Sequence, residues 1–70
     1  MQIIAELVPR RGEETVTLEP GARGFDLLRA LRLPPNAHLL VRGGTPIPID
    51  EPLADGERIR VIGVVSGGSA

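Results

Sequence analysis

The residues with the clearest chemical potential in this chain are Gly67 and Gly68, which follow Ser66 directly. Glycine has no side chain to block close approach of its carbonyl carbon, so a narrow active-site tunnel can admit two such residues in extended form and little else. A free glycine carboxylate in such a tunnel could be adenylated and then attacked by a thiolate or by sulfide. The product would be a thioester or a thiocarboxylate on the last atom of the chain, and another protein would supply the catalytic groups.

Two further residues, Ser69 and Ala70, follow the diglycine, so the carboxyl group of Gly68 is held in a peptide bond. We expect a protease to cut between Gly68 and Ser69 before any activation. Two alternatives stay open, since Ser69-Ala70 could be a cloning remnant, and the tail could be one that is never activated.

The other ionisable groups show no active-site spacing. The chain has no cysteine and one histidine, His38, so it holds no thiolate metal site and no cysteine nucleophile. The pair Gly43-Gly44 is typical of a hairpin turn, because a phosphate-binding loop would need more glycines and a following helix. We therefore expect that the chain is not an enzyme and binds no cofactor of its own.

Composition limits the partners. The chain has 70 residues, enough for one small domain, with eight basic and nine acidic residues and a single aromatic side chain. This balance argues against a nucleic-acid partner, which needs basic groups and stacking surfaces. Apolar runs are too short to span a bilayer and no signal peptide opens the sequence, so we expect a cytoplasmic protein without a membrane partner. All basic residues are Arg, which fits a thermophilic source or codon bias alone.

Apolar periodicity predicts the elements. Residues 1–8 and 13–18 alternate as two strands around a Gly-containing turn, with Ile3, Ala5 and Leu7 on one face of the first. Residues 22–33 have helical spacing, and Pro34-Pro35 ends that helix.

Three more strands are predicted at residues 37–42, 45–49 and 57–62. The second of these contains two prolines, which is typical of an edge strand. The order of elements is that of an α+β, β-grasp fold, a mixed sheet of four to five strands with one helix packed across it. The last strand would run parallel to the first in the centre of the sheet. We expect a domain at residues 1–64 and a flexible tail at 65–70.

Strand alternation also predicts a docking surface. With Leu39, Val41, Ile59 and Val61 assigned to the core, Leu40 and Ile62 would point outward on neighbouring strands. The alternative, two isolated surface aliphatics, stays open. The residues predicted to bind a partner protein are Leu40, Ile62, Arg42, Arg60, Val64 and Val65.

The chain resembles the ubiquitin-like sulfur carriers and protein modifiers of prokaryotes, those of the ThiS and MoaD type and especially the small archaeal ubiquitin-like modifiers. The similarity covers nearly the whole chain in element order, and its most specific feature is the diglycine placed after the last strand. The segments that carry it are residues 38–44, 46–48, 53, 55–61 and 66–68.

This resemblance implies that Gly68 is the activated residue and Gly67 its partner. An adenylyltransferase related to ubiquitin-activating enzymes would form the acyl adenylate, and the ATP and zinc of such systems would belong to that partner. A JAMM-type protease would remove Ser69-Ala70. Two fates are implied, namely sulfur transfer from a thiocarboxylate to an acceptor enzyme, or an isopeptide bond to a lysine of a target protein.

Two other functions stay open. The chain could be a non-enzymatic β-grasp interaction module with an inert tail, or the small subunit of a molybdopterin synthase, which shares the same terminal chemistry.

Overall fold

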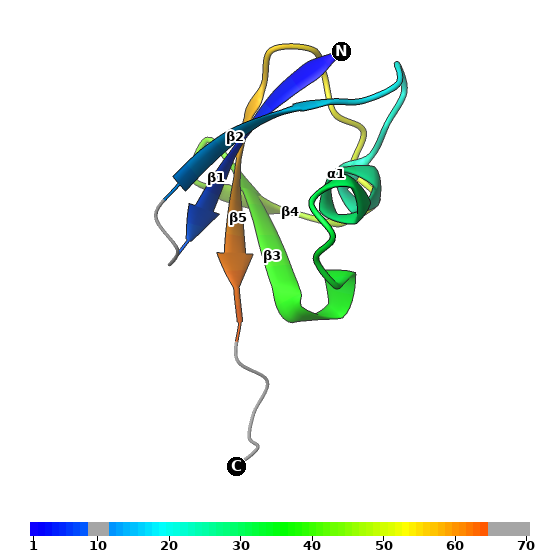
Figure 1. Cartoon of the computed structure of the whole chain (residues 1–70). Helices are drawn as coiled ribbons and strands as arrows, with labels where there is room; N and C mark the ends of the chain where they lie inside the picture. The colour runs from blue at the N-terminus through cyan, green and yellow to red at the C-terminus, as the bar shows by residue number, and fades with distance from the viewer. Residues whose placement is uncertain (9–11, 65–70) are drawn as a thin grey trace.

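The structure, a computed structural model, describes residues 1–8 and 12–64 (Figure 1). The predicted tail at 65–70 and most of the first turn lie outside the described residues. The elements, in chain order, are β1 (Gln2–Val8), β2 (Gly12–Thr17), α1 (Gly24–Ala30), the short 3₁₀ helix η1 (Pro35–Ala37), β3 (His38–Arg42), β4 (Thr45–Ile47) and β5 (Arg58–Gly63).

These strands form one mixed sheet in the order β2-β1-β5-β3-β4. β1 and β5 are parallel, with Ala5 opposite Ile59, and the other neighbouring strands are antiparallel. The predicted β-grasp arrangement is therefore confirmed, with the last strand beside the first at the centre. β4, which contains Pro46, lies at the sheet edge as predicted, because proline cannot donate a ladder hydrogen bond.

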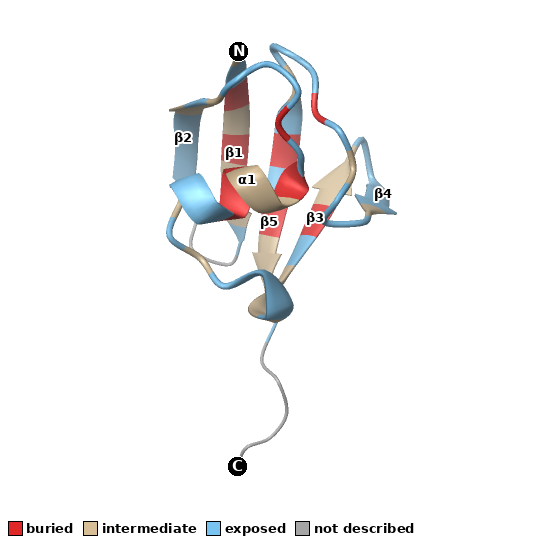
Figure 2. Ribbon diagram, turned by 90° about the vertical axis from the view of Figure 1, so that its right-hand side faces the viewer, coloured by how far each residue is buried: buried red, intermediate tan, exposed pale blue. Residues whose placement is uncertain are grey.

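The core lies between the sheet and α1, which crosses one face of it (Figure 2). Alternation along β1 and β5 buries every second side chain, as their period of two predicts, and Leu27 and Leu28 cover them from the helix. Leu53, from the connection before β5, closes the core at one side. Among the described residues, the largest fully buried side chains are Ile3, Leu27, Leu28, Leu40, Ile59 and Val61.

The prediction of which β3 side chains point into the core is wrong, and this orientation of the strand is called its facing below. Leu40, expected outside, is 1% exposed, whereas Leu39, expected in the core, is 50% exposed. Three consecutive apolar residues at 39–41 allow either facing, and the long-range pairing with β5 decides between them by placing Leu40 opposite Val61.

The start of α1 fixes that facing. A Cβ on Gly24 would lie 2.4 Å from Leu40 Cδ1 and 2.7 Å from the carbonyl oxygen of Ile49. The helix backbone therefore rests directly on the Leu40 side chain, and only glycine permits this approach.

α1 is shorter than the predicted segment 22–33 and has defined ends. The Asp26 carboxylate accepts a hydrogen bond from the Arg23 backbone N–H at 2.8 Å, at the start of the helix. At the other end, the backbone N–H of Leu33 donates to the Leu28 carbonyl at 2.9 Å, and that of Arg32 donates to Arg29 at 3.0 Å. This is a Schellman motif, with Arg32 in the left-handed region at a φ of 61°. The helix thus ends before Pro34-Pro35 is reached.

The Arg32→Gly variant is expected to be more stable than the wild type by about 1 kcal/mol, because glycine adopts positive φ without the steric cost of a Cβ. In a domain of this size the melting temperature should rise by about 4–8 °C, as followed by circular dichroism. Arg29→Gly, inside the same helix, is the matched control and should lower stability by about 1 kcal/mol. A melting temperature of Arg32→Gly at or below that of the wild type would contradict this reading of the helix end.

Candidate functional site

The face of the sheet that α1 does not cover, here called the outer face, carries the exposed side chains of the central strands. On β5, Arg58, Arg60 and Ile62 point to this face, and they alternate with the buried Ile59 and Val61. Because β5 lies between β1 and β3, the outer face is continuous across three strands.

An apolar group occupies the end of the outer face where β5 finishes. The strand register places Val8 of β1 and Leu39 of β3 on either side of Ile62, so the three lie side by side. Val64 continues the alternation of β5, and its backbone N–H donates to the Ala37 carbonyl at 2.9 Å. Val8 is 38% exposed and Val64 40%, so these side chains offer contact area to a partner. The residues Val8, Leu39, Ile62 and Val64 are called the outer apolar patch below.

Two of the residues predicted to bind a partner, Ile62 and Val64, lie in the outer apolar patch. Leu40 does not, and the prediction that it meets a partner is wrong because its side chain is sealed between the sheet and α1. Leu39 occupies the exposed position that was predicted for Leu40. Val8 was not among the residues predicted to bind a partner. The sequence contained a signal for its outward side chain, because Val8 alternates in step with Ile4 and Glu6 along β1.

Beside the patch, the outer face is charged. Glu6 lies between two guanidinium groups, with its Oε2 2.6 Å from Arg58 Nη1 and its Oε1 3.5 Å from Arg60 Nε. Arg58 also pairs with Glu13 on β2. Arg60 therefore lies on the outer face, as expected, and the face is divided into a charged part and an apolar part.

These ion pairs are expected to make the stability of the folded domain depend on pH. The hydrogen bond from Arg58, with a smaller contribution from Arg60, lowers the pKa of Glu6 below its ordinary value. A carboxyl group whose pKa falls on folding stabilises the native state above its unfolded pKa, and this contribution disappears as the pH falls through the folded value. Thermal unfolding between about pH 7 and pH 2 should show a smaller acid loss of stability for Glu6→Gln than for the wild type. Identical pH profiles would contradict a stabilising role for this group.

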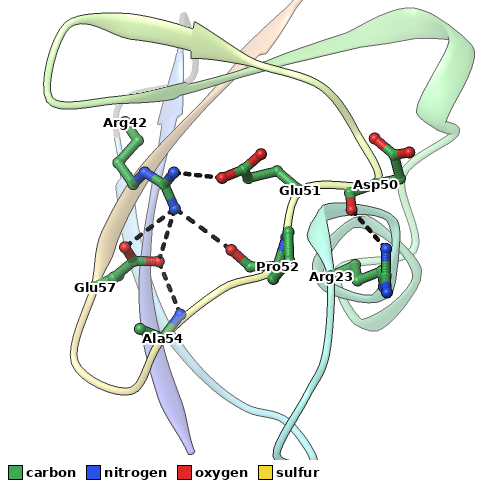
Figure 3. Close-up of polar contacts among 7 residues, drawn as sticks. All are labelled: Arg23, Arg42, Asp50, Glu51, Pro52, Ala54 and Glu57. Atoms are coloured by element: carbon green, nitrogen blue, oxygen red, sulfur yellow. Dashed lines mark hydrogen bonds and ion pairs between the residues drawn. The ribbon is translucent and has the colours of Figure 1, made fainter.

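Arg42, also predicted to bind a partner, lies elsewhere (Figure 3). It shares the facing of Leu40, and its Nη2 is 2.6 Å from Glu51 Oε2 while its Nη1 is 3.2 Å from Glu57 Oε2. The Glu51 hydrogen bond is the largest cause of the raised pKa of Arg42.

The same cluster holds the connection between β4 and β5. Arg42 Nη1 also donates to the Pro52 carbonyl at 3.4 Å, and Glu57 Oε1 accepts from the Ala54 backbone N–H at 2.9 Å. The grouping of Arg42 with Ile62 and Arg60 on one docking surface is therefore wrong, since its guanidinium positions this connection on the other side of the sheet.

The predicted reactive and processing residues, Gly67, Gly68 and Ser69, lie outside the described residues, as does Val65. The structure defines the position from which they start. β5 is held on both sides, by β1 and by β3, and the bond from Val64 to Ala37 fixes the chain to its last described residue. Figure 1 shows that this end of β5 lies at the opposite end of the sheet from Met1.

In the part of the chain that the structure describes, no helix has the length and apolar character needed to cross a membrane. Among those same residues, no cluster of three or more His, Cys, Asp and Glu side chains has the arrangement of a metal site.

A five-stranded mixed sheet with a central parallel pair and one crossing helix is the fold of ubiquitin-like proteins, and comparison with known structures agrees. The crystal structure of SAMP1 from Haloferax volcanii matches with a TM-score of 0.73 and 20% identity, covering 97% of this chain and 100% of that one. The Caldiarchaeum subterraneum ubiquitin matches with a TM-score of 0.71 and 22% identity, covering 97% of this chain and 98% of that one. A designed protein based on human erythrocytic ubiquitin matches with a TM-score of 0.68 and 20% identity, covering 99% and 98%.

The family model of small archaeal modifier protein 2 matches residues 1–65, and the chain belongs to this family. It is thus a small ubiquitin-like protein of the modifier and sulfur-carrier kind, a group of non-enzymatic carriers. Among curated protein sequences, none matches this chain.

Proposed function

We propose that this chain is a protein modifier, a sulfur carrier or both, and that its reactive atom is the carboxyl carbon of Gly68 after hydrolysis of the Gly68–Ser69 bond. The observation that supports this most is the position of the diglycine in the sequence, three residues beyond the point where the central strand loses its last described hydrogen bond. The folded domain therefore precedes a short peptide segment whose last two residues before the cleavage point, Gly67 and Gly68, have no side chain.

The proposed chemistry has two steps. The Gly68 carboxylate attacks the α-phosphorus of ATP on an adenylyltransferase, and pyrophosphate leaves. A thiolate or sulfide then attacks the acyl carbon of the adenylate, AMP leaves, and a thioester or thiocarboxylate remains. The thiocarboxylate can donate its sulfur through an acceptor enzyme, and water then restores the Gly68 carboxylate. Alternatively, a lysine amine of a target protein attacks the thioester, the thiol leaves, and an isopeptide bond remains.

The outer apolar patch is the surface we assign to the activating partner. Three residues lie between Val64 and Gly68 in the sequence, so covalent geometry limits the distance between the Cα atoms of Val64 and Gly68 to about 14 Å. A partner that covers the patch can therefore hold the diglycine in its own active site. Exposed aliphatic side chains beside an arginine, here Arg60, are typical of protein–protein contacts.

Leu39→Asp and Ile62→Asp are expected to lower the rate of adenylation by the activating partner, by about tenfold or more, because each places a charge in the apolar contact. The measurement is ATP–pyrophosphate exchange at a limiting concentration of the chain. Ile49→Asp is the matched control, because Ile49 is also 40% exposed but lies outside the patch. Unchanged exchange with both patch variants, in a domain that circular dichroism shows to be folded, would remove the patch from the proposal.

The chemistry itself is tested with two forms of the chain and the cognate adenylyltransferase. Residues 1–68 should support ATP–pyrophosphate exchange, and after addition of sulfide their mass should change by the replacement of one oxygen with sulfur. Residues 1–70 should do neither until a JAMM-type protease has removed Ser69-Ala70. If neither form is adenylated and the chain still binds its partners without residues 67–70, it is an interaction module and the proposal is wrong.

A further inference from the structure

The exposed side of α1 carries a second group of residues suited to recognition. Phe25 and Arg29 are four residues apart in the helix and therefore lie on one face, and Arg32 follows at the helix end. Together with Leu33 and the Pro34-Pro35 pair, these side chains line a hollow of about 360 Å³. α1, which carries Phe25 and Arg29, covers the face of the sheet opposite the outer face (Figure 2).

Arg29 and Arg32 differ from the other arginines that the structure describes. Arg42, Arg58 and Arg60 are each engaged with glutamates, and Arg23 Nη1 donates to the Asp50 carbonyl at 3.1 Å. Within residues 1–8 and 12–64, neither Arg29 nor Arg32 has a carboxylate within ion-pair distance. Two guanidinium groups are thus available to a carboxylate of another molecule.

Phe25 is the single aromatic residue of the chain, yet it is only half-buried and does not belong to the central core cluster. Its backbone is firmly held, because the Phe25 N–H donates to the Ile49 carbonyl at 2.7 Å and that of Gly24 donates to Glu51 at 3.0 Å. A partly exposed aromatic ring on a fixed backbone is a typical anchor of a binding surface, since little conformational entropy is lost when it is covered.

Arg32 adds an independent observation. It adopts a positive φ at a position that glycine occupies at lower conformational cost. A residue kept in an unfavourable backbone region points to a use for its side chain that glycine would not provide. Because the Arg32 side chain lines the hollow, the role that fits its surroundings is to present a positive charge there.

From these observations we infer that the surface formed by Phe25, Arg29 and Arg32 docks an acidic segment of a partner protein. Carboxylates of the segment would pair with the two guanidinium groups, whose planar donors match carboxylate geometry, while an apolar side chain packs against Phe25. Because this surface lies on the helix side, it can be occupied while the outer apolar patch contacts another protein.

The surface is less suited to other anionic partners. Two arginines would release few counterions from a nucleic acid, and they would add only a weak electrostatic attraction to an anionic membrane. A second copy of this chain is also a poor fit, since several of its surface carboxylates are already engaged, such as Glu51 with Arg42.

The proposal is tested by selecting a displayed library of random twelve-residue peptides against the full chain. Enriched peptides should be rich in Asp and Glu and contain a large apolar residue. Their affinity should fall about tenfold or more on Arg29→Glu, and also when ionic strength rises from about 0.05 to about 0.5 M. Arg60→Glu, which makes the same charge change on the opposite face, should leave the affinity unchanged.

Arg32→Gly separates recognition from folding. It should weaken peptide binding although it raises the melting temperature, which a merely structural role for Arg32 cannot explain. The proposal is overturned if the enriched peptides are not acidic, or if they bind Arg29→Glu as tightly as the wild type. It is equally overturned if this face instead mediates self-association in sedimentation, or binds vesicles of anionic lipid.

Discussion

Replacing Leu40 with Asp is expected to unfold this domain, whereas the same change at the neighbouring Leu39 is expected to leave it folded. Leu40 is enclosed by the core, and removing such a side chain costs about 2–5 kcal/mol even without adding a charge. A domain of this size rarely has more than about 3–5 kcal/mol of stability, and a buried carboxylate without a partner adds a further desolvation cost.

Circular dichroism and urea unfolding of both variants measure this difference. Leu40→Met, which conserves volume, is the matched control and should cost less than about 1.5 kcal/mol. If Leu40→Asp were as stable as Leu39→Asp, the facing of β3 would be reversed, and Leu40 would return to the docking surface.

The second large effect is expected in the tail. In residues 1–68, Gly67→Val should lower the rate of adenylation about 100-fold or more, because a branched side chain displaces the reacting carboxylate from the tunnel that the proposal requires, and displacements of about 1 Å can have effects of this size. The readout is ATP–pyrophosphate exchange with the cognate adenylyltransferase. Unfolding should be unaffected, because Gly67 lies three residues beyond the last residue of the described domain.

Ser66→Ala is the matched control, since it changes the residue before the diglycine and keeps both glycines. Its exchange rate should stay close to that of the wild type. Equal rates for Gly67→Val and Ser66→Ala would mean that activation does not require position 67 to lack a side chain, and would contradict the proposed role of Gly67.

The sequence predicts most of this fold because its patterns are local and mutually consistent. Alternation with a period of two identifies β1 and β5, a helical spacing identifies α1, and two prolines mark the edge strand. The predicted C-terminal boundary of the helix is less accurate. The helix ends where Arg32 adopts the left-handed conformation, and the sequence has no glycine there to indicate this end.

The positions of the residues that we assign to docking were only partly predictable from the sequence. Ile62 and Arg60 follow from the alternation of β5, which has polar residues to mark its outward side. β3 has three apolar residues in succession, so its facing is decided by contacts that are distant in sequence, from Val61 and from the start of α1 at Gly24. Arg42 was misplaced for the same reason, since it shares the facing of Leu40. The charges that engage it, Glu51 and Glu57, come from a later part of the chain.

The claim on which the account depends is that this domain presents the Gly68 carboxyl group to another protein for activation. Mass spectrometry of the protein purified from its native cell, with its C-terminal peptide sequenced, tests this most directly. The account predicts a chain that ends at Gly68, with the terminal carboxyl free, converted to a thiocarboxylate or joined to a lysine. A population that retains Ser69 and Ala70 throughout, with no adduct at Gly68, would contradict it.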